Sequence, residues 1–195
     1  MADLQKTRTE PIQQFWDMTD DVRAGMLGVT GSRQHMQPMH PNCDRAGRTI
    51  WFFVKLDSEI VEAVGQGGHG HFCVVGRSND YHACVAGKLT VERNQAIIDR
   101  FWSSVAAAWF TGKDDPNMTL LKLALDDGVA WASVGPIAFG WEILKANMSS
   151  NKEPDVGVRQ HFSFLHAPST GAENSARRPA MPGQAAGAAR QDGQV

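Results

Sequence analysis

Apolar residues in the first third of the chain occur in short runs that are separated by turn-forming residues. These runs cover residues 25–29, 34–39 and 49–54, with Gly, Ser, Asn and Asp between them. Runs of this length between such residues are typical of β-strands in a meander. The third run has large apolar side chains at both odd and even positions from Ile50 to Phe53. It therefore predicts a strand that is covered on both faces.

The middle of the chain predicts a hairpin followed by an amphipathic helix. Residues 71–76 and 81–91 are strand-like, and the polar residues 77–80 between them favour a turn. Apolar residues then recur at three- and four-residue spacing from Ile97 to Ala108. This spacing predicts one helix, which ends near Gly112.

A short helix near the N-terminus and two late strands are also predicted. Proline fits the first turn of a helix, so the early helix is expected to begin at Pro11. Strands at 119–125 and 129–133 are expected to be joined by a turn at the polar residues 126–128, before a helical stretch at 141–147.

A further helix is expected from Ser58, which would cap its first turn, to Gly65, which would end it. The glycine-rich residues 65–70 follow a helix and not a strand, so they predict a mobile linker rather than a phosphate-binding loop. In total, about seven strands alternate with about four isolated helices. This pattern predicts a mainly β fold, a closed or partly closed β-barrel with peripheral helices.

Length and composition indicate one folded domain. With 195 residues, of which 42% are hydrophobic, the chain can bury one sizeable core but not two large ones. We expect a flexible N-terminus at 1–10 and a folded domain at 11–166. We also expect a disordered tail at 167–195, where Ala, Gly, Pro and Gln dominate.

The charge balance favours neither nucleic acid nor a membrane as partner, and we predict neither. A formal net charge of −2 gives no electrostatic reason to expect nucleic acid or an anionic membrane as partner. No apolar run approaches the length of a membrane span or of a signal sequence, which predicts a cytoplasmic location. The cysteines, Cys43, Cys73 and Cys84, are too few for a disulfide framework and are interpreted as small buried side chains.

Sequence motifs for hydrolases and nucleoside triphosphatases do not occur: G-x-S-x-G, the phosphate-binding P-loop, and G-x-G-x-x-G between a strand and a helix are all missing. His69, His71 and Cys73 alternate, so they would share one face of a strand, an arrangement that can hold a transition metal. No fourth ligand is obvious, and we predict no metal site.

Five groups of short motifs, taken in order, resemble one protein family. They are Met-Leu-Gly at 26–28, Gln-Pro-Met at 37–39, Ile-Trp-Phe-Phe at 50–53, Ala-Trp-Phe with Asp-Asp-Pro and Leu-Leu-Lys-Leu between 108 and 123, and Glu-Pro-Asp-Val-Gly at 153–157. From about residue 12 to about residue 164, the chain resembles bacterial general stress proteins with a pyridoxamine 5'-phosphate oxidase-like split barrel.

The resemblance implies a flavin mononucleotide (FMN) site that two subunits of a homodimer build together. By position, it places nine residues against the flavin: His35, Met36, Gln37, Pro38, Met39, Phe53, Val54, Ser58 and His82. A phosphate near Ser58 would be stabilised by the free N–H groups and the dipole of the helix that follows. Trp109 and Phe110 are predicted to reach the pocket of the partner subunit, because one small barrel cannot easily bury so many aromatic side chains. The alternative is that they cap their own barrel.

Two residues depart from the pattern of the related flavin binders. Val54 stands where they usually have Thr, and Ile60 where they usually have a basic residue. Each lost charge-assisted hydrogen bond to the phosphate would cost about 1.5–3 kcal/mol. Lys55, Arg33 or His35 could compensate.

The resemblance leaves two functions open. One is an FMN-binding general stress protein that acts as a flavin-dependent oxidoreductase or as a flavin carrier. The other is a non-catalytic, stress-related ligand-binding dimer with weak or no flavin affinity, which the two departures favour. Oxidation of pyridoxamine phosphate is not predicted, because a shared fold is weak evidence for a shared reaction.

Removal of the residues after Ala167 is expected to leave the melting temperature nearly unchanged. This tail carries too little apolar surface to offset the conformational entropy lost on ordering it. Thermal unfolding of the full chain and of the truncated chain, followed by circular dichroism, tests this expectation. A decrease of many degrees would mean that the tail packs on the domain.

Overall fold

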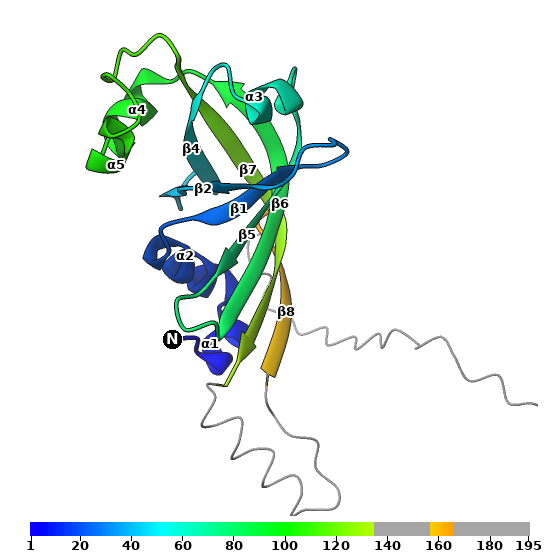
Figure 1. The fold of residues 1–195 in the computed structure, drawn as a ribbon. Helices are drawn as coiled ribbons and strands as arrows, with labels where there is room; N and C mark the ends of the chain where they lie inside the picture. The colour runs from blue at the N-terminus through cyan, green and yellow to red at the C-terminus, as the bar shows by residue number, and fades with distance from the viewer. Residues whose placement is uncertain (135–156, 166–195) are drawn as a thin grey trace, which may run out of the picture.

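The computed structural model describes residues 1–134 and 157–165. A long, twisted antiparallel sheet forms the body of the molecule, and five short helices lie around it (Figure 1). The helical stretch predicted at 141–147 and the tail after residue 167 lie outside the described residues. Among the residues described, no helix is long and apolar enough to cross a bilayer.

The described part of the sheet has eight strands, and all of their pairings are antiparallel. The strands are β1 (Gly25–Val29), β2 (Gln37–Met39), β3 (Asn42–Asp44), β4 (Thr49–Lys55), β5 (Gly68–Val75), β6 (Tyr81–Glu92), β7 (Met118–Ser133) and β8 (Gly157–Ser163). Their order is β2-β1-β5-β6-β7-β4-β3, and β8 also pairs with β7. The predicted mainly β, split-barrel architecture with few helices is confirmed.

Strand β7 organises the sheet because it is long enough to pair with three other strands. One of its edges pairs with β6 along almost its whole length. The other edge pairs with β4 over residues 118–124 and with β8 over residues 127–133. The sheet therefore divides along β7 into an upper part with β4 and a lower part with β8 (Figure 1).

The sequence prediction of a turn at residues 126–128 is wrong, because β7 continues through them. The partners of Ala86 and Gly87 on β7 are Asp127 and Leu125, so Asp126 is an extra, unpaired residue. This is a β-bulge, which changes the face on which each side chain lies. Before the bulge the odd-numbered residues of β7, such as Leu125, are buried, and after it the even-numbered ones are.

The helices are α1 (Leu4–Thr9), α2 (Pro11–Asp21), α3 (Glu59–Val64), α4 (Gln95–Phe101) and α5 (Ser104–Ala107). Helix α2 begins at Pro11, as predicted, and buries Phe15 and Trp16 against the lower part of the sheet. There the ring of Phe15 lies 6.0 Å from that of Phe164, between ring centroids.

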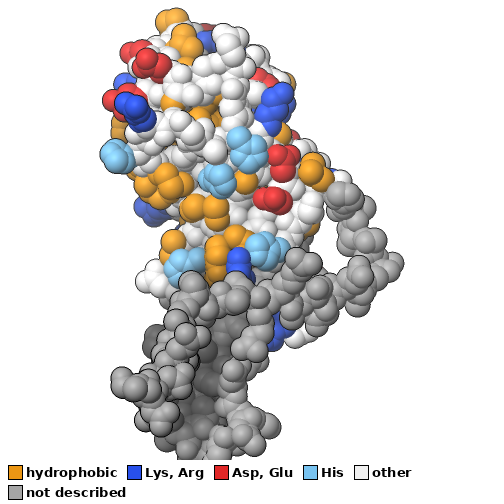
Figure 2. Space-filling view, turned by 90° about the vertical axis from the view of Figure 1, so that its right-hand side faces the viewer, with side chains coloured by type: hydrophobic (Ala, Val, Ile, Leu, Met, Phe, Trp, Pro, Cys, Tyr) orange, Lys and Arg blue, Asp and Glu red, His pale blue; other side chains and the backbone are white. Residues whose placement is uncertain are grey.

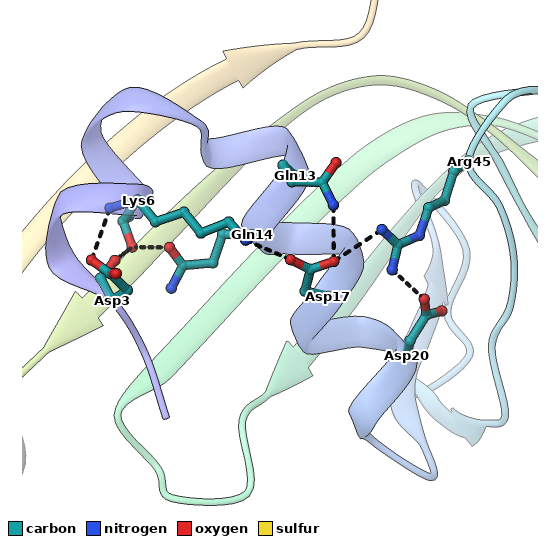
Figure 3. A network of polar contacts seen from close by, with 8 residues as sticks. Asp3, Lys6, Gln13, Gln14, Asp17, Asp20 and Arg45 are labelled. Carbon is teal, nitrogen blue, oxygen red and sulfur yellow. Dashed lines mark hydrogen bonds and ion pairs between the residues drawn. The ribbon is translucent and has the colours of Figure 1, made fainter.

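Helix α1 lies in the segment that we expected to be flexible. Asp3 caps it by accepting a hydrogen bond from the backbone N–H of Lys6. The hydroxyl of Thr7 is buried and donates to Gln14 of α2 over 3.0 Å, while Lys6 forms an ion pair of 2.7 Å with Asp17 of α2 (Figure 3). Contacts with α2, not local propensity, stabilise this six-residue helix.

Three further predictions need correction. The single helix expected from Ile97 to Ala108 is divided into α4 and α5, because Ser103 caps a new helix by accepting from the N–H of Ala106. The expected linker at 65–70 already belongs to β5 from Gly68 onward. Strands β3 and β8 were not predicted at all.

Substitution of Gly87 by Ala is expected to destabilise the protein by about 1–3 kcal/mol or more, the usual cost of overpacking a closed core. A Cβ atom at Gly87 would lie only 1.9 Å from the carbonyl oxygen of Ala124, beside the bulge. Gly112→Ala is the matched control, because its Cβ would meet no atom within 4 Å among the described residues. Chemical denaturation of both variants measures the difference, and equal free energies of unfolding would contradict the close approach at the bulge.

Candidate functional site

The candidate site is a cavity of about 480 Å³ at the upper part of the sheet. Its walls come from β2, β4 and α5, with residues that precede β1 and α3 at its edges. The antiparallel β3–β4 and β4–β7 pairings fix β4 in the sheet, so that Phe53 and Val54 occupy set positions in the wall.

Most of the flavin contacts predicted from the sequence lie together in this cavity. The lining includes Gln37, Pro38, Met39, Phe53, Val54 and Ser58. Trp109, which was predicted to reach the pocket of a partner subunit, lines the cavity of its own subunit. Three predicted residues do not line it: His35, Met36 and His82. His35 and Met36 precede β2 and are exposed. His82 alternates with the buried Tyr81 and Ala83 on β6, so it lies on the outer face of the sheet.

An aromatic group forms one wall of the cavity. The ring of Phe53 lies 6.2 Å from Trp102, at an interplanar angle of 76°, and 6.4 Å from Phe110. Phe110 is 8% exposed and belongs to a small core with Trp51. The prediction that Phe110 reaches outward to a partner is therefore wrong, because it packs within its own subunit.

Trp109 differs from these buried aromatic side chains. It follows α5 at the rim of the cavity, and 70% of its surface is exposed. A tryptophan normally buries most of its large apolar surface. Trp109 is thus available for contact with a ligand or with another chain.

Two cationic residues, Arg23 and Lys55, lie at the cavity. Neither forms an ion pair with an acidic side chain in the part of the chain that the structure describes. Of the three residues considered from the sequence as compensating contacts, Lys55 lines the cavity, whereas Arg33 and His35 do not.

The sequence did not indicate Arg23, because it stands between α2 and β1 and belongs to no recognisable motif. The structure positions its backbone through His40, whose Nδ1 lies 2.7 Å from the carbonyl oxygen of Arg23. His40 follows β2 and also lines the cavity, as do Asn42 and Ser103. The side-chain amide of Asn42 donates to the carbonyl oxygen of Trp51, which ties this wall to β4.

The start of α3 differs from the expected anion site. The hydroxyl of Ser58 donates to the carbonyl oxygen of Lys55 over 2.7 Å and does not cap the helix. The helix has only six residues, and its first turn contains the acidic residues Glu59 and Glu62. Ile60, at the position where the resemblance implies a basic residue, is 1% exposed and packs in the core beside the cavity. Lys55 and Arg23, rather than this helix, supply positive charge to the cavity.

On the face of the molecule shown in Figure 2, several His side chains lie among hydrophobic ones. His69, His71 and Cys73 share the outer face of β5, as their alternation predicts. His69 faces Asp126, with 3.4 Å between Nε2 and Oδ2, and Nδ1 of His71 lies 3.1 Å from the hydroxyl of Thr30. Within the residues described, no three His, Cys, Asp or Glu side chains are grouped closely enough to hold a metal ion.

Comparison with known proteins adds a family match. The family described as "Pyridoxamine 5'-phosphate oxidase like" matches residues 10–155 of the chain. General stress protein 26 of Bacillus subtilis (strain 168) is 40% identical over 120 residues, which cover 59% of this chain and 84% of that protein.

Solved structures agree with the fold. The crystal structure of a general stress protein 26 from Jannaschia sp. CCS1 has a TM-score of 0.68 and 32% sequence identity, covering 80% of this chain and 99% of the other. The general stress FMN/FAD binding protein from Xanthomonas citri has a TM-score of 0.57 and 32% identity, covering 64% of this chain and 90% of the other.

Proposed function

The chain belongs to the pyridoxamine 5'-phosphate oxidase-like family, and on that premise we propose that it binds FMN in the cavity between β2, β4 and α5. One observation carries the proposal. Six residues that the sequence placed against a flavin, on two separate segments, line a single cavity that has an aromatic wall and two cations. The flavin-binding relative from Xanthomonas citri supports the same ligand class.

The flavin ring suits the apolar part of the cavity. Pro38, Met39 and Val54 provide apolar surface, and Phe53 is held in place by its contacts with Trp102. A flat aromatic ring can be bound between such side chains, while a few polar groups fix its orientation. Gln37 and Asn42 are the polar side chains available for that purpose.

The phosphate is assigned to the end of the cavity at Lys55 and Ser58. Lys55 can neutralise one charge of the phosphate, and Arg23 at the cavity edge can supply a second. Val54 and Ile60 also line the cavity, but their apolar side chains supply no charge. We therefore expect FMN to bind more weakly than it would with both usual contacts present.

When bound, FMN supplies hydride or electron transfer, and the residues of this chain bind and orient it. An oxidoreductase or a flavin carrier is the first form of the proposal. The burial of Val54 and Ile60 in place of phosphate contacts favours a second form, a ligand-binding dimer without turnover. The two forms differ in whether the bound flavin is reduced and reoxidised in repeated cycles by an added electron donor and acceptor.

We further propose that the functional unit is a homodimer. The exposed indole of Trp109 lies at the cavity rim, where a two-fold contact would bury it and bring groups of the second subunit to the flavin. His82 lies outside the cavity of its own subunit, so a contact between His82 and flavin would require that second subunit.

FMN is expected to bind at one site per subunit, with Lys55 contributing through the phosphate. Lys55→Ala should weaken FMN binding about tenfold, the loss expected for one partly exposed charge-assisted hydrogen bond. Riboflavin, which has no phosphate, should bind the variant and the native protein equally. Titrations followed by flavin absorbance and fluorescence measure both affinities.

The control for this titration is Lys88→Ala, which removes an exposed positive charge from β6 away from the cavity. It should leave both affinities unchanged. If the native protein does not bind FMN at high micromolar concentration, the cofactor assignment is rejected. If Lys55→Ala loses as much affinity for riboflavin as for FMN, Lys55 does not act through the phosphate.

Trp109→Ala is expected to weaken both self-association and FMN binding. Truncation of a large aromatic side chain at the centre of an interface commonly costs about 2 kcal/mol or more. Light scattering measures the association. The matched control is Trp131→Ala, which truncates an indole that is 40% exposed on β7. If the Trp131→Ala variant dissociates while the Trp109→Ala variant remains associated, the interface does not include Trp109.

A further inference from the structure

Two of the three cysteines lie directly opposite each other in the sheet. Cys73 of β5 and Cys84 of β6 are paired in the strand register. Their neighbours along each strand, such as Phe72 and Val85, are fully buried, so both thiols lie on the outer face of the sheet. Both cysteines are half-buried there and form no disulfide.

The type of strand pair brings the two thiols close together. The N–H of Gly76 donates to the carbonyl oxygen of Tyr81 over 2.8 Å, so these residues form a hydrogen-bonded pair. Hydrogen-bonded and non-hydrogen-bonded pairs alternate along an antiparallel ladder. The β5–β6 register is unbroken over this stretch, and Cys73 and Cys84, three positions further, therefore form a non-hydrogen-bonded pair.

In a non-hydrogen-bonded pair the Cα atoms are separated by about 4.5 Å, at the short end of the range that a disulfide spans. The two sulfur atoms can thus be joined without a change of strand register. Because both strands are held on their other edges by β1 and β7, the bridge must form within a fixed ladder. A disulfide formed under such constraint is more easily reduced than a relaxed structural one.

The surroundings make the pair reactive and accessible. The neighbouring thiol of Cys84 lowers the pKa of Cys73 to about 7, and the neighbouring Cys73 together with burial raises the pKa of Cys84. Cys84 also lines a cavity of about 550 Å³ on this face, together with His71, Asp127 and His161. A small polar oxidant can therefore reach the thiols from solvent. A thiolate, rather than a thiol, is the nucleophile in such reactions.

Cys43 has the opposite environment. It lies on β3, remote in the sheet order from β5 and β6. Burial, together with the nearby carboxylate of Asp20, raises the pKa of its thiol. Cys43 is therefore expected to stay protonated and unreactive near neutral pH, and it provides an internal control.

We propose that Cys73 and Cys84 form a redox-active dithiol that peroxides oxidise to an intramolecular disulfide. This role is separate from flavin binding, because neither cysteine lines the flavin cavity. The thiolate of Cys73 attacks one oxygen of the peroxide and the O–O bond breaks. Cys73 becomes a sulfenic acid, and the departing oxygen leaves as water or an alcohol after it takes up a proton.

The sulfur of Cys84 then attacks the sulfur of Cys73. The S–O bond breaks, the S–S bond forms, and the oxygen leaves as water with the proton from Cys84. Together the two thiols supply two electrons, which reduce one peroxide. A low-molecular-weight thiol restores the pair by thiol–disulfide exchange and is itself converted to a disulfide.

The test treats the reduced full-length protein with hydrogen peroxide, in the absence of flavin, and digests it with trypsin after blocking free thiols. Cleavage after Lys55, Arg77 and Lys88 separates Cys73 and Cys84 into different peptides, and Cys43 into a third. Mass spectrometry is expected to show the first two peptides joined in the monomer, with Cys43 still blocked as a free thiol. The oxidation rate should rise with pH through about 7, as the Cys73 thiolate forms.

Matched variants assign the two roles. Cys84→Ser should leave a sulfenic acid on Cys73 that a dimedone probe traps, whereas Cys43→Ser should form the bridge at the native rate. The proposal would be overturned if all three cysteines were still free thiols after treatment with excess peroxide. It would also be overturned if the disulfide formed only between subunits, or if Cys43 were oxidised as fast as Cys73 and Cys84. Flavin binding that fails while the bridge forms would leave this proposal intact.

Discussion

The pairing of β6 with β7 is the contact on which the rest of the structure depends. Its twelve register pairs run along almost the whole length of the molecule. All remaining strands join the sheet from one side or the other of this ladder. On the β6 side lies β5, and on the β7 side lie β4 and β8. A long antiparallel ribbon of this kind is strongly twisted, and the twist is what allows one sheet to enclose a core.

The bulge at Asp126 lets this single ribbon serve two parts of the core. A strand without a bulge would keep the same set of side chains on one face along its whole length. The extra residue exchanges the faces, so Leu121 and Leu123 are buried beside β4 while Ala130 and Ala132 are buried beside β8. Large side chains thus support the strand that bears the candidate site, and small ones leave room for the aromatic residues of α2 and β8.

The sequence predicted those elements whose signals are local. Pro11 at the start of α2 and the polar turn between β5 and β6 determine the local backbone conformation by themselves. Strand β8 depends on β7, from which undescribed residues separate it in the chain, and helix α1 depends on its tertiary contacts with α2. The bulge at Asp126 was predicted as a turn because residues 126–128 are of the types that occur in turns. The motif-bearing wall of the cavity was likewise predictable, whereas Arg23 was not, because only the fold brings it to the same cavity as Lys55.

The two terminal strands of the described order are poorly suited to pair with a strand of another chain. In the described strand order the terminal strands, β2 and β3, have only three residues each. Pro38 lies at the centre of β2 and has no N–H to offer to an incoming strand. Short, interrupted edges of this kind are poor templates for cross-β growth. The two terminal strands of the described order therefore present few backbone groups with which an unfolded chain could pair.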